Sequence, residues 1–277
     1  VTFSTYCIFF TCFSSLPMSN FLEYNVEKEG VKMAVYKLVL RYDGTRYRGW
    51  QKQGNTENTI QGILEKALSD ILGQPVDAAG SGRTDEGVHA RMQVVSFHAK
   101  TDLAAGDILR ALRGALPSDI GAVSLEEAPP RFHARLSCAG KTYVYRIWNS
   151  PEPCVFERRY VYVLPGELDM DAMRTAAALL CGTHDYAAFC SAKRMKHSTV
   201  RTVESIEITR QGQEVRITYS GSGFLYNMVR ILTGTLIEVG HGKRRPGDMP
   251  VILDSLDRQN AGPTAPAKGL FLWEVRY

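Results

Sequence analysis

From residue 34 onward, two kinds of hydrophobic periodicity alternate along the chain and predict strands and helices in turn. Segment 34–44, AVYKLVLRYDG, is rich in β-branched and aromatic residues and ends in Asp-Gly, which is typical of a strand followed by a turn. Segment 58–73 places its apolar residues at helical spacing and stops at Gly73. The rest of this half predicts a short strand before the glycines at 80–82, a strand at 92–99, a helix at 107–117 and a strand at 120–130.

The second half repeats the scheme with stronger strand signals. Strands are predicted over 141–149 and 158–165, and segment 169–182 predicts a helix with Asp169 as its N-cap. Segment 202–221 predicts a hairpin around Gln211-Gly212. The remaining elements are a long helix, a shorter helix and a closing strand, over 224–240, 247–256 and 269–277.

This order of elements predicts an α+β fold. Two successive βαββαβ patterns indicate two ferredoxin-like (RRM-like) halves that share a mainly antiparallel sheet, with an active-site cleft between them. We place the halves at 34–138 and 139–277. Residues 1–33 differ in composition, because their apolar run is too short to span a bilayer and no basic residues precede it. We expect them to form a poorly ordered N-terminal extension; the alternative is a short hairpin or strand packed on the domain.

Composition narrows the class of protein only slightly. The 277 residues carry a formal net charge of +4, an excess that is compatible with a polyanionic partner but common among enzymes. The six cysteines include no C-x-x-C pair, and the six histidines have no metal-ligand spacing. We therefore expect free thiols in a cytoplasmic protein, no metal site and no association with a membrane.

Candidate chemistry begins in segment 80–90, GSGRTDEGVHA, which sets Asp85 among three glycines. An acid in a glycine turn is more often structural than catalytic. A cation such as Arg83 would lower the pKa of Asp85 and keep it ionised, which suits a nucleophile or a base. The segment lacks the P-loop lysine and the glycine that a dinucleotide fingerprint needs at 85. Ser81 and His89 could join an acid in a hydrolase triad, although no nucleophile-elbow pattern accompanies them.

Two further segments could contribute to a site. Tyr143 and Tyr145 lie on one face of a predicted strand, where aromatic rings either stack on unpaired RNA bases or belong to the core. Arg230 lies in an apolar helix, at its edge or buried, and a buried arginine needs a carboxylate partner such as Asp85. The bases of 191–198 and 240–248 are solvated surface unless a nucleic-acid site lies elsewhere in the chain.

Six motifs together resemble one family. They are YDGTRYRGWQKQ, TIQGILEKAL, GSGRTDEGVHARMQVVSF, FHARLSCAGKTYVYRI, GFLYNMVRILTGTLIEVG and TAPAKGLFLWEV. In this order, over about 34–277, the chain resembles the tRNA pseudouridine synthase A family, whose members isomerise uridine at positions 38–40 of the anticodon stem–loop. Ser81 and Glu86 stand where alanine is more usual in that family.

The resemblance implies a role for each candidate residue. It implies that Asp85 is the catalytic carboxylate, that Tyr143 packs on the uracil and that Arg230 pairs with Asp85. It also implies that Arg83 fills the space left by the flipped nucleotide and that Leu225 belongs to the apolar wall of the pocket.

The resemblance also implies partners. It indicates a homodimer that binds one tRNA across both subunits, without cofactor or metal, and we expect the bases of 193–197 and 243–245 to contact phosphates. Two alternatives stay open on sequence grounds. One is an RNA-binding module without catalysis, and the other is a hydrolase that cradles phosphate in the glycine-rich segment.

Overall fold

The computed structural model describes residues 33–192 and 198–277, and its first half follows the predicted order of elements. The elements of this half are β1 (Met33–Tyr42), α1 (Ile60–Leu72), β2 (Ala78–Gly80), β3 (His89–Lys100), α2 (Ala105–Ala115) and β4 (Ile120–Ala128). Thr59 caps α1 by accepting from the Gly62 amide, and Gly73 ends the helix with a φ of 63°. The prediction from periodicity is confirmed for each of these six elements.

The second half contains most of the predicted elements and one that was not predicted. Its elements are β5 (Gly140–Trp148), β6 (Tyr162–Val163), α3 (Met170–Leu179), β7 (Gly182–Asp185), β8 (Val200–Gln211), β9 (Glu214–Gly221), α4 (Met228–Gly240), α5 (Asp248–Ser255) and β10 (Leu270–Arg276). Asp169 caps α3 as predicted, accepting from two backbone amides. The hairpin of β8 and β9 turns at Gly212, whose φ is 58°.

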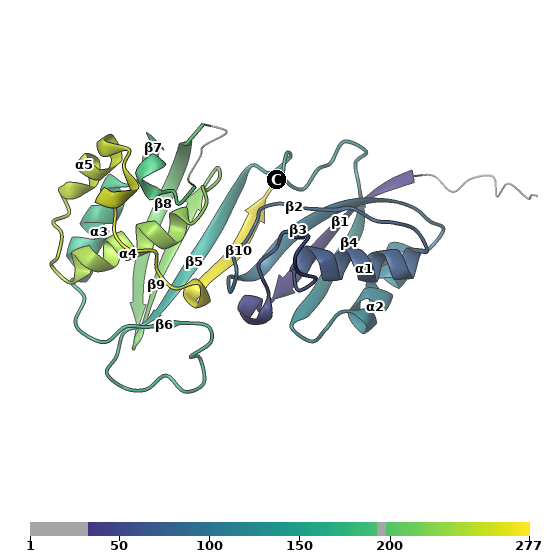
Figure 1. Ribbon diagram of the computed structural model, residues 1–277, viewed down its shortest axis with the longest axis horizontal. Helices are drawn as coiled ribbons and strands as arrows, with labels where there is room; N and C mark the ends of the chain where they lie inside the picture. The colour runs from purple at the N-terminus through teal and green to yellow at the C-terminus, as the bar shows by residue number, and fades with distance from the viewer. Residues whose placement is uncertain (1–32, 193–197) are drawn as a thin grey trace, which may run out of the picture. The chain divides into compact units, whose positions relative to one another are not determined.

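The architecture is α+β, with one large, mainly antiparallel sheet. In the described residues this sheet has ten strands in the order β4-β1-β3-β10-β5-β9-β8-β7, and β2 and β6 pair with β3 and β5 (Figure 1). Buried and half-exposed residues alternate strictly along β9. Val215, Ile217 and Tyr219 are fully buried, so one face of this strand belongs to the core and the other is open to solvent.

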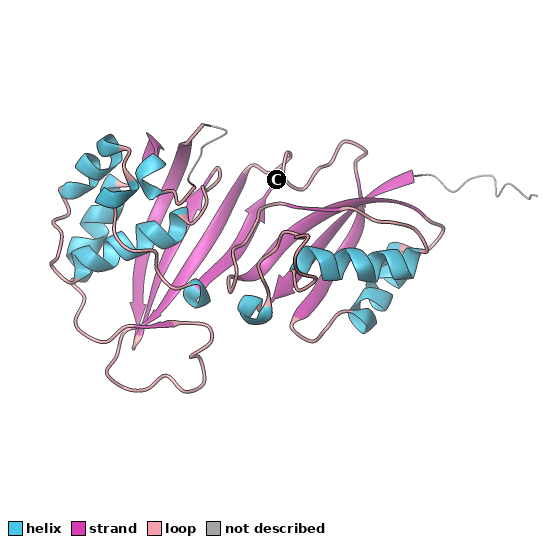
Figure 2. Cartoon of the chain, in the orientation of Figure 1, coloured by secondary structure: helices cyan, strands magenta, loops and turns pink. Residues whose placement is uncertain are grey.

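The strand predicted at 158–165 is mostly wrong, because β6 keeps only two of its residues. The chain leaves the sheet after Trp148 and returns through a long loop (Figure 2). Near the end of this loop, the Tyr160 hydroxyl donates to Asp43 Oδ2 at 3.0 Å, and its ring lies edge-on to His89. These contacts hold Tyr160 outside the sheet despite its strand propensity.

The last strand lies in the middle of the sheet. β10 pairs antiparallel with β5 over six positions and parallel with β3 at Phe271↔His89 and Leu272↔Ala90 (Figure 1). It therefore connects the strands of the first half with those of the second. None of the helices in the described part of the chain is both long enough and apolar enough to cross a bilayer.

Because β1 begins at Met33, we expect a chain that starts at this residue to fold and to act normally. Its melting temperature should match that of the full chain, and so should its catalytic activity. Circular dichroism and a turnover assay on both proteins check this. A melting temperature lower by several degrees would mean that residues 1–32 pack on the domain, which was the alternative reading of the sequence.

Candidate active site

The loop that carries Asp85 runs from β2 to β3 and is fixed by bonds from several directions. The Thr84 carbonyl accepts from the Trp50 amide at 3.0 Å, and the Thr84 hydroxyl bonds the Tyr42 hydroxyl at 2.8 Å. Gln93 donates to the Gly82 carbonyl at 2.8 Å. Just after Asp85, Gly87 has a φ of 75°, a conformation that favours glycine and turns the chain into β3. The glycine-rich sequence thus makes a tightly held loop.

This loop forms one wall of a cavity with a volume of about 420 Å³. Four of the five residues predicted for the site line it: Arg83, Asp85, Tyr143 and Leu225. They come from the 81–88 loop, from β5 and from the segment before α4, which are far apart in the sequence. The structure therefore brings these predicted residues together around one space.

Arg230, the fifth predicted residue, lies beside Asp85. Its Nη1 is 3.5 Å from Asp85 Oδ2, and the two side chains are 17% and 23% exposed. The guanidinium is held from the other side, because Nη1 donates to Asn227 Oδ1 at 2.9 Å and Nε donates to the Ala265 carbonyl at 2.7 Å. The geometry of the ion pair is thus set by the N-terminal turn of α4 and by the segment before β10.

The expected direction of the Asp85 pKa shift is wrong. Burial of the carboxyl group raises its pKa, and the nearby Arg230 charge opposes this rise only in part. The counter-charge also comes from Arg230 and not from Arg83, whose side chain is exposed. Burial therefore disfavours the ionised form of Asp85, and Arg230 compensates only in part. A cation that forms next to the carboxylate would be stabilised by this incompletely compensated negative charge.

The two tyrosines of β5 have different environments on the same face of the strand. Tyr143 lines the cavity with 8% exposure and meets the Phe224 ring edge-on at 5.3 Å. Tyr145 is fully buried and donates to the Pro266 carbonyl at 2.7 Å. Burial raises the pKa of the Tyr143 hydroxyl well above its ordinary value, so this side chain offers the cavity a neutral aromatic ring.

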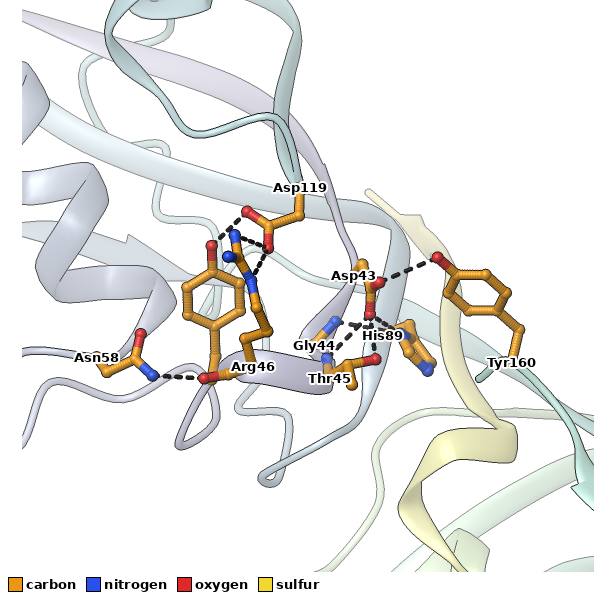
Figure 3. Close-up of polar contacts among 9 residues, drawn as sticks. Asp43, Gly44, Thr45, Arg46, Asn58, His89, Asp119 and Tyr160 are labelled. Atoms are coloured by element: carbon orange, nitrogen blue, oxygen red, sulfur yellow. Dashed lines mark hydrogen bonds and ion pairs between the residues drawn. The ribbon is translucent and has the colours of Figure 1, made fainter. Parts of the chain in front are cut away.

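The geometry contradicts a hydrolase triad of Ser81 and His89. Ser81 Oγ donates to Gln93 Oε1 at 2.6 Å. His89 is buried in a different cluster, where its Nδ1 accepts from the Gly44 amide at 3.1 Å and lies beside Asp43 (Figure 3). Burial lowers the pKa of His89, so the neutral ring anchors the end of the loop and does not activate Ser81.

Sequence reasoning missed three basic residues that line the cavity: Arg135, Lys141 and Arg201. Lys141 precedes Tyr143 by two residues on β5, so strand alternation places both side chains on one face. That spacing was the available signal for Lys141. Arg135 and Arg201 come from other segments, and only the fold brings them to this space.

The two basic segments predicted to contact phosphates are 193–197 and 243–245, and the second of them is not among the residues that line the cavity. Residues 193–197 lie outside the described part of the chain. Lys243 and Arg245 are exposed, whereas Arg244 is engaged with Glu238 at 2.5 Å and with the Asn260 carbonyl at 2.8 Å. This loop follows the C-terminal end of α4, about 15 Å along the helix from Arg230.

Metal-ligating side chains do not gather in the residues that the structure covers. Within 33–192 and 198–277, there is no group of three or more His, Cys, Asp or Glu side chains placed to hold an ion.

Comparison with known proteins finds that the chain is similar to tRNA pseudouridine synthases. The family model for tRNA pseudouridine synthase matches residues 38–136 and 176–277. The chain is 46% identical to tRNA pseudouridine synthase A of Brevibacillus brevis, over 87% of this chain and 98% of that protein. It is 45% identical to the Geobacillus kaustophilus protein of the same name, over 87% of this chain and 93% of the relative.

Proposed function

The chain belongs to the tRNA pseudouridine synthase family of isomerases, and from this premise we propose that it converts uridine to pseudouridine at positions 38–40 of the tRNA anticodon stem–loop, with Asp85 as the catalytic carboxylate and without a cofactor. The observation that carries the proposal is the position of Asp85. It is a half-buried carboxylate paired with Arg230, in a cavity whose lining includes four basic side chains, three aromatic rings and several aliphatic side chains.

The reaction breaks the N1–C1′ bond of uridine, turns the uracil and joins its C5 to C1′. The proton on C5 is lost and N1 is protonated, so the reaction is an isomerisation without net redox change. Positive charge develops at C1′ as the glycosidic bond breaks, and an adjacent carboxylate stabilises that charge or attacks the carbon. Asp85 is suited to this role because burial has removed part of its hydration.

The other residues hold the substrate around this carboxylate. Because a base within a stem is stacked, the target nucleotide must leave the stack to reach the cavity. The Tyr143 ring then packs on the uracil, Leu225 adds apolar contact, and the exposed Arg83 occupies the space that the nucleotide leaves. Arg230 orients Asp85 and balances its charge.

The direct test is to incubate the full chain with unmodified tRNA transcripts and to map pseudouridine by carbodiimide treatment and primer extension. New stops at positions 38, 39 or 40, without added metal or cofactor, are expected. Stops elsewhere in the tRNA would refute the anticodon stem–loop as the target, and absence of stops would refute the activity.

The cavity lies between parts of the chain that we propose to be two ferredoxin-like halves, 34–138 and 139–277, after an extension at 1–33. The order β1-α1-β2-β3-α2-β4 supports this division for the first half. The family model also matches in two segments, 38–136 and 176–277. Co-expression of the halves as separate chains tests the boundary, since a correct cut should give a soluble complex.

We further propose that the protein acts in the cytoplasm as a homodimer that holds one tRNA across both subunits. The open face of the sheet, formed at β9 by half-exposed side chains, leaves a surface that a second copy could cover. Sedimentation equilibrium of the full chain tests the dimer, because a monomer mass at micromolar concentration would exclude it.

We expect Lys243 and Arg245 to contact tRNA phosphates. Arg244 is left in place because it forms an ion pair with Glu238. Replacing Lys243 and Arg245 with alanine should weaken binding equally for all tRNAs and reduce the salt slope of log affinity by about 0.7–0.9 for each lost contact. The measurement is tRNA affinity from low to high salt.

The matched control replaces Lys66 and Lys100, which are exposed on the first half, with alanine. Lys66 pairs with Asp70 at 2.7 Å, but both side chains are exposed, so losing this pair costs little stability. Both proteins then lose the same charge. A slope that changes equally in the two variants, or in neither, would remove the 243–245 loop from the binding surface.

A further inference from the structure

Lys141 is a half-buried ammonium group in the cavity that Asp85 and Tyr143 line. Among residues 33–192 and 198–277, none of the ion pairs joins Lys141 to a carboxylate. Its polar neighbour is the thiol of Cys138, which itself donates to the Gly140 carbonyl at 3.4 Å. Burying a charge without an opposite charge destabilises a protein, so such a group usually serves a ligand.

The side chain of Lys141 lies close to the Asp85 loop. A Cβ atom built on Gly82 would lie 3.3 Å from Lys141 Cε and 3.8 Å from its Nζ, so the loop backbone passes close to the side-chain stem. The Lys141 stem therefore lies against the loop at Gly82, three residues before Asp85. A larger side chain at position 82 would push Lys141 away.

The charges around Lys141 favour an anion. Arg135 and Arg201 line the same cavity, and both lie near enough to disfavour the charged form of Lys141. Arg201 is oriented by bonds from Nη1 to the carbonyls of Ser198 and Val200. Burial is the largest cause of the lowered pKa of Lys141, and the two arginines add to it. Three converging cations repel one another unless an anion lies between them.

The spacing of Lys141 and Tyr143 indicates how far from the Tyr143 ring an anion bound by Lys141 would lie. Two residues along a strand span about 6.7 Å, and both side chains point to one face. This distance is comparable to that between a base and a phosphate of its own nucleotide. If a flipped uracil packs on Tyr143, a phosphate next to it comes within reach of Lys141.

We propose that Lys141, together with Arg135 and Arg201, forms a phosphate subsite that binds a phosphodiester adjacent to the target uridine. This inference rests on the proposed function, since it assigns part of the same cavity. The subsite holds the sugar while the uracil is detached, and Lys141 acts as a positioning residue that touches the substrate backbone and not the reacting atoms.

The test combines a protein change with an RNA change. The Lys141→Met variant removes the charge and keeps the volume, and an anticodon stem–loop RNA carries one neutral methylphosphonate linkage on the 5′ or 3′ side of the target uridine. For the unaltered protein, one of the two linkages should weaken binding about 10- to 100-fold, as expected for a charged hydrogen bond. Lys141→Met should bind the unmodified RNA that much more weakly and lose nothing further with that linkage.

Two companion variants separate the subsite from a structural role. Lys141→Arg should keep its sensitivity to the neutral linkage, because it keeps the charge. Lys100→Met removes an exposed lysine at the far end of β3 and should bind both RNAs as the unaltered protein does. The melting temperature of Lys141→Met should be equal to or above that of the unaltered protein, because an unpaired, half-buried charge is lost.

Losses that add independently at both linkages would overturn the subsite, and so would a melting temperature several degrees lower in Lys141→Met. The subsite is tested by binding: the effects of Lys141→Met and of the neutral linkage are coupled when the variant loses nothing further with that linkage. The proposed function is tested by turnover. If the unaltered protein isomerises tRNA but the effects of Lys141→Met and of the neutral linkage are independent, only the subsite is refuted. If the two effects on binding are coupled but the unaltered protein isomerises no tRNA, the proposed function is refuted and the subsite is supported.

Discussion

The Asp85→Asn variant should lose isomerisation by about 10³-fold or more while binding tRNA within a few-fold of the unaltered protein. Asparagine has the shape of aspartate, but it cannot stabilise positive charge at C1′ or attack that carbon. Single-turnover rates with excess enzyme, together with filter-binding affinities, measure the two quantities separately. Turnover close to that of the unaltered protein would remove Asp85 from the chemistry.

The melting temperature of this variant carries independent information. Because burial raises the Asp85 pKa, folding disfavours the ionised form, and the carboxylate destabilises the native state at neutral pH. A neutral amide removes that cost, so Asp85→Asn should melt no lower than the unaltered protein at pH 7. A clear fall would mean that the ion pair with Arg230 contributes more to stability than the burial of Asp85 costs.

The neighbouring Glu86 provides the matched control. It is an exposed carboxylate one residue further along the same loop, paired with Arg48 at 2.5 Å. Glu86→Gln should keep nearly full turnover, because an exposed ion pair contributes little. If Glu86→Gln lost as much activity as Asp85→Asn, the effect would come from the charge of the whole loop and not from one catalytic carboxylate.

Replacing Arg230 with methionine should have the second largest effect. The variant removes the charge beside Asp85 and the bonds to Asn227 and the Ala265 carbonyl. The charged contact with Asp85 alone, at about 1.5–3 kcal/mol for a charged hydrogen bond, corresponds to a fall in turnover of about 10- to 100-fold. The melting temperature should also fall by several degrees, and an unchanged value would mean that these bonds do not support the fold.

The pH profile distinguishes loss of charge from loss of shape. Under the proposed function, activity requires ionised Asp85, so it should be lost as pH falls through the Asp85 pKa, which burial has already raised. Arg230 opposes that rise, and the other titratable groups that line the same cavity include Arg83 and the neutral Tyr143. Removing Arg230 should therefore move the acid limb of kcat/KM to higher pH. Arg230→Lys keeps a charge and should move the limb less, and equal shifts in both variants would contradict the electrostatic argument.

Much of the fold could be predicted because local patterns set its elements. Segment 58–73 has helical spacing and a terminal glycine, and α1 lies within it over Ile60–Leu72 and ends at Gly73 as predicted. The strand at 158–165 could not be predicted correctly, because Tyr160 is held by Asp43 and His89, residues more than seventy positions away. β7 has four residues and a weak pattern, and it exists because β8 provides a pairing edge.

Some features of the candidate site could be predicted from local sequence, whereas others depend on contacts between distant segments. The glycine-rich loop and its acid are visible in the sequence, and so is the alternation that places Tyr143 on one strand face. The direction of the Asp85 pKa shift depends on burial by other segments, which periodicity does not reveal. Lys141 lies on β5, Arg135 in the loop before β5 and Arg201 on β8, so only the fold brings the three side chains to one cavity.

The placement of β10 between β3 and β5 has a consequence for synthesis on the ribosome. β5 is complete at Trp148, but the strand that covers its edge begins at Leu270. At about 5–20 residues per second, the nascent chain waits about 6–24 s before that edge can be paired. During this interval the unpaired edge of β5 is open to wrong partners, so the nascent protein should depend on chaperones at this stage. Asp85 lies in the loop before β3 and Tyr143 lies on β5, and β10 is the strand that joins β3 to β5. We therefore expect the candidate site to be complete only after β10 has emerged.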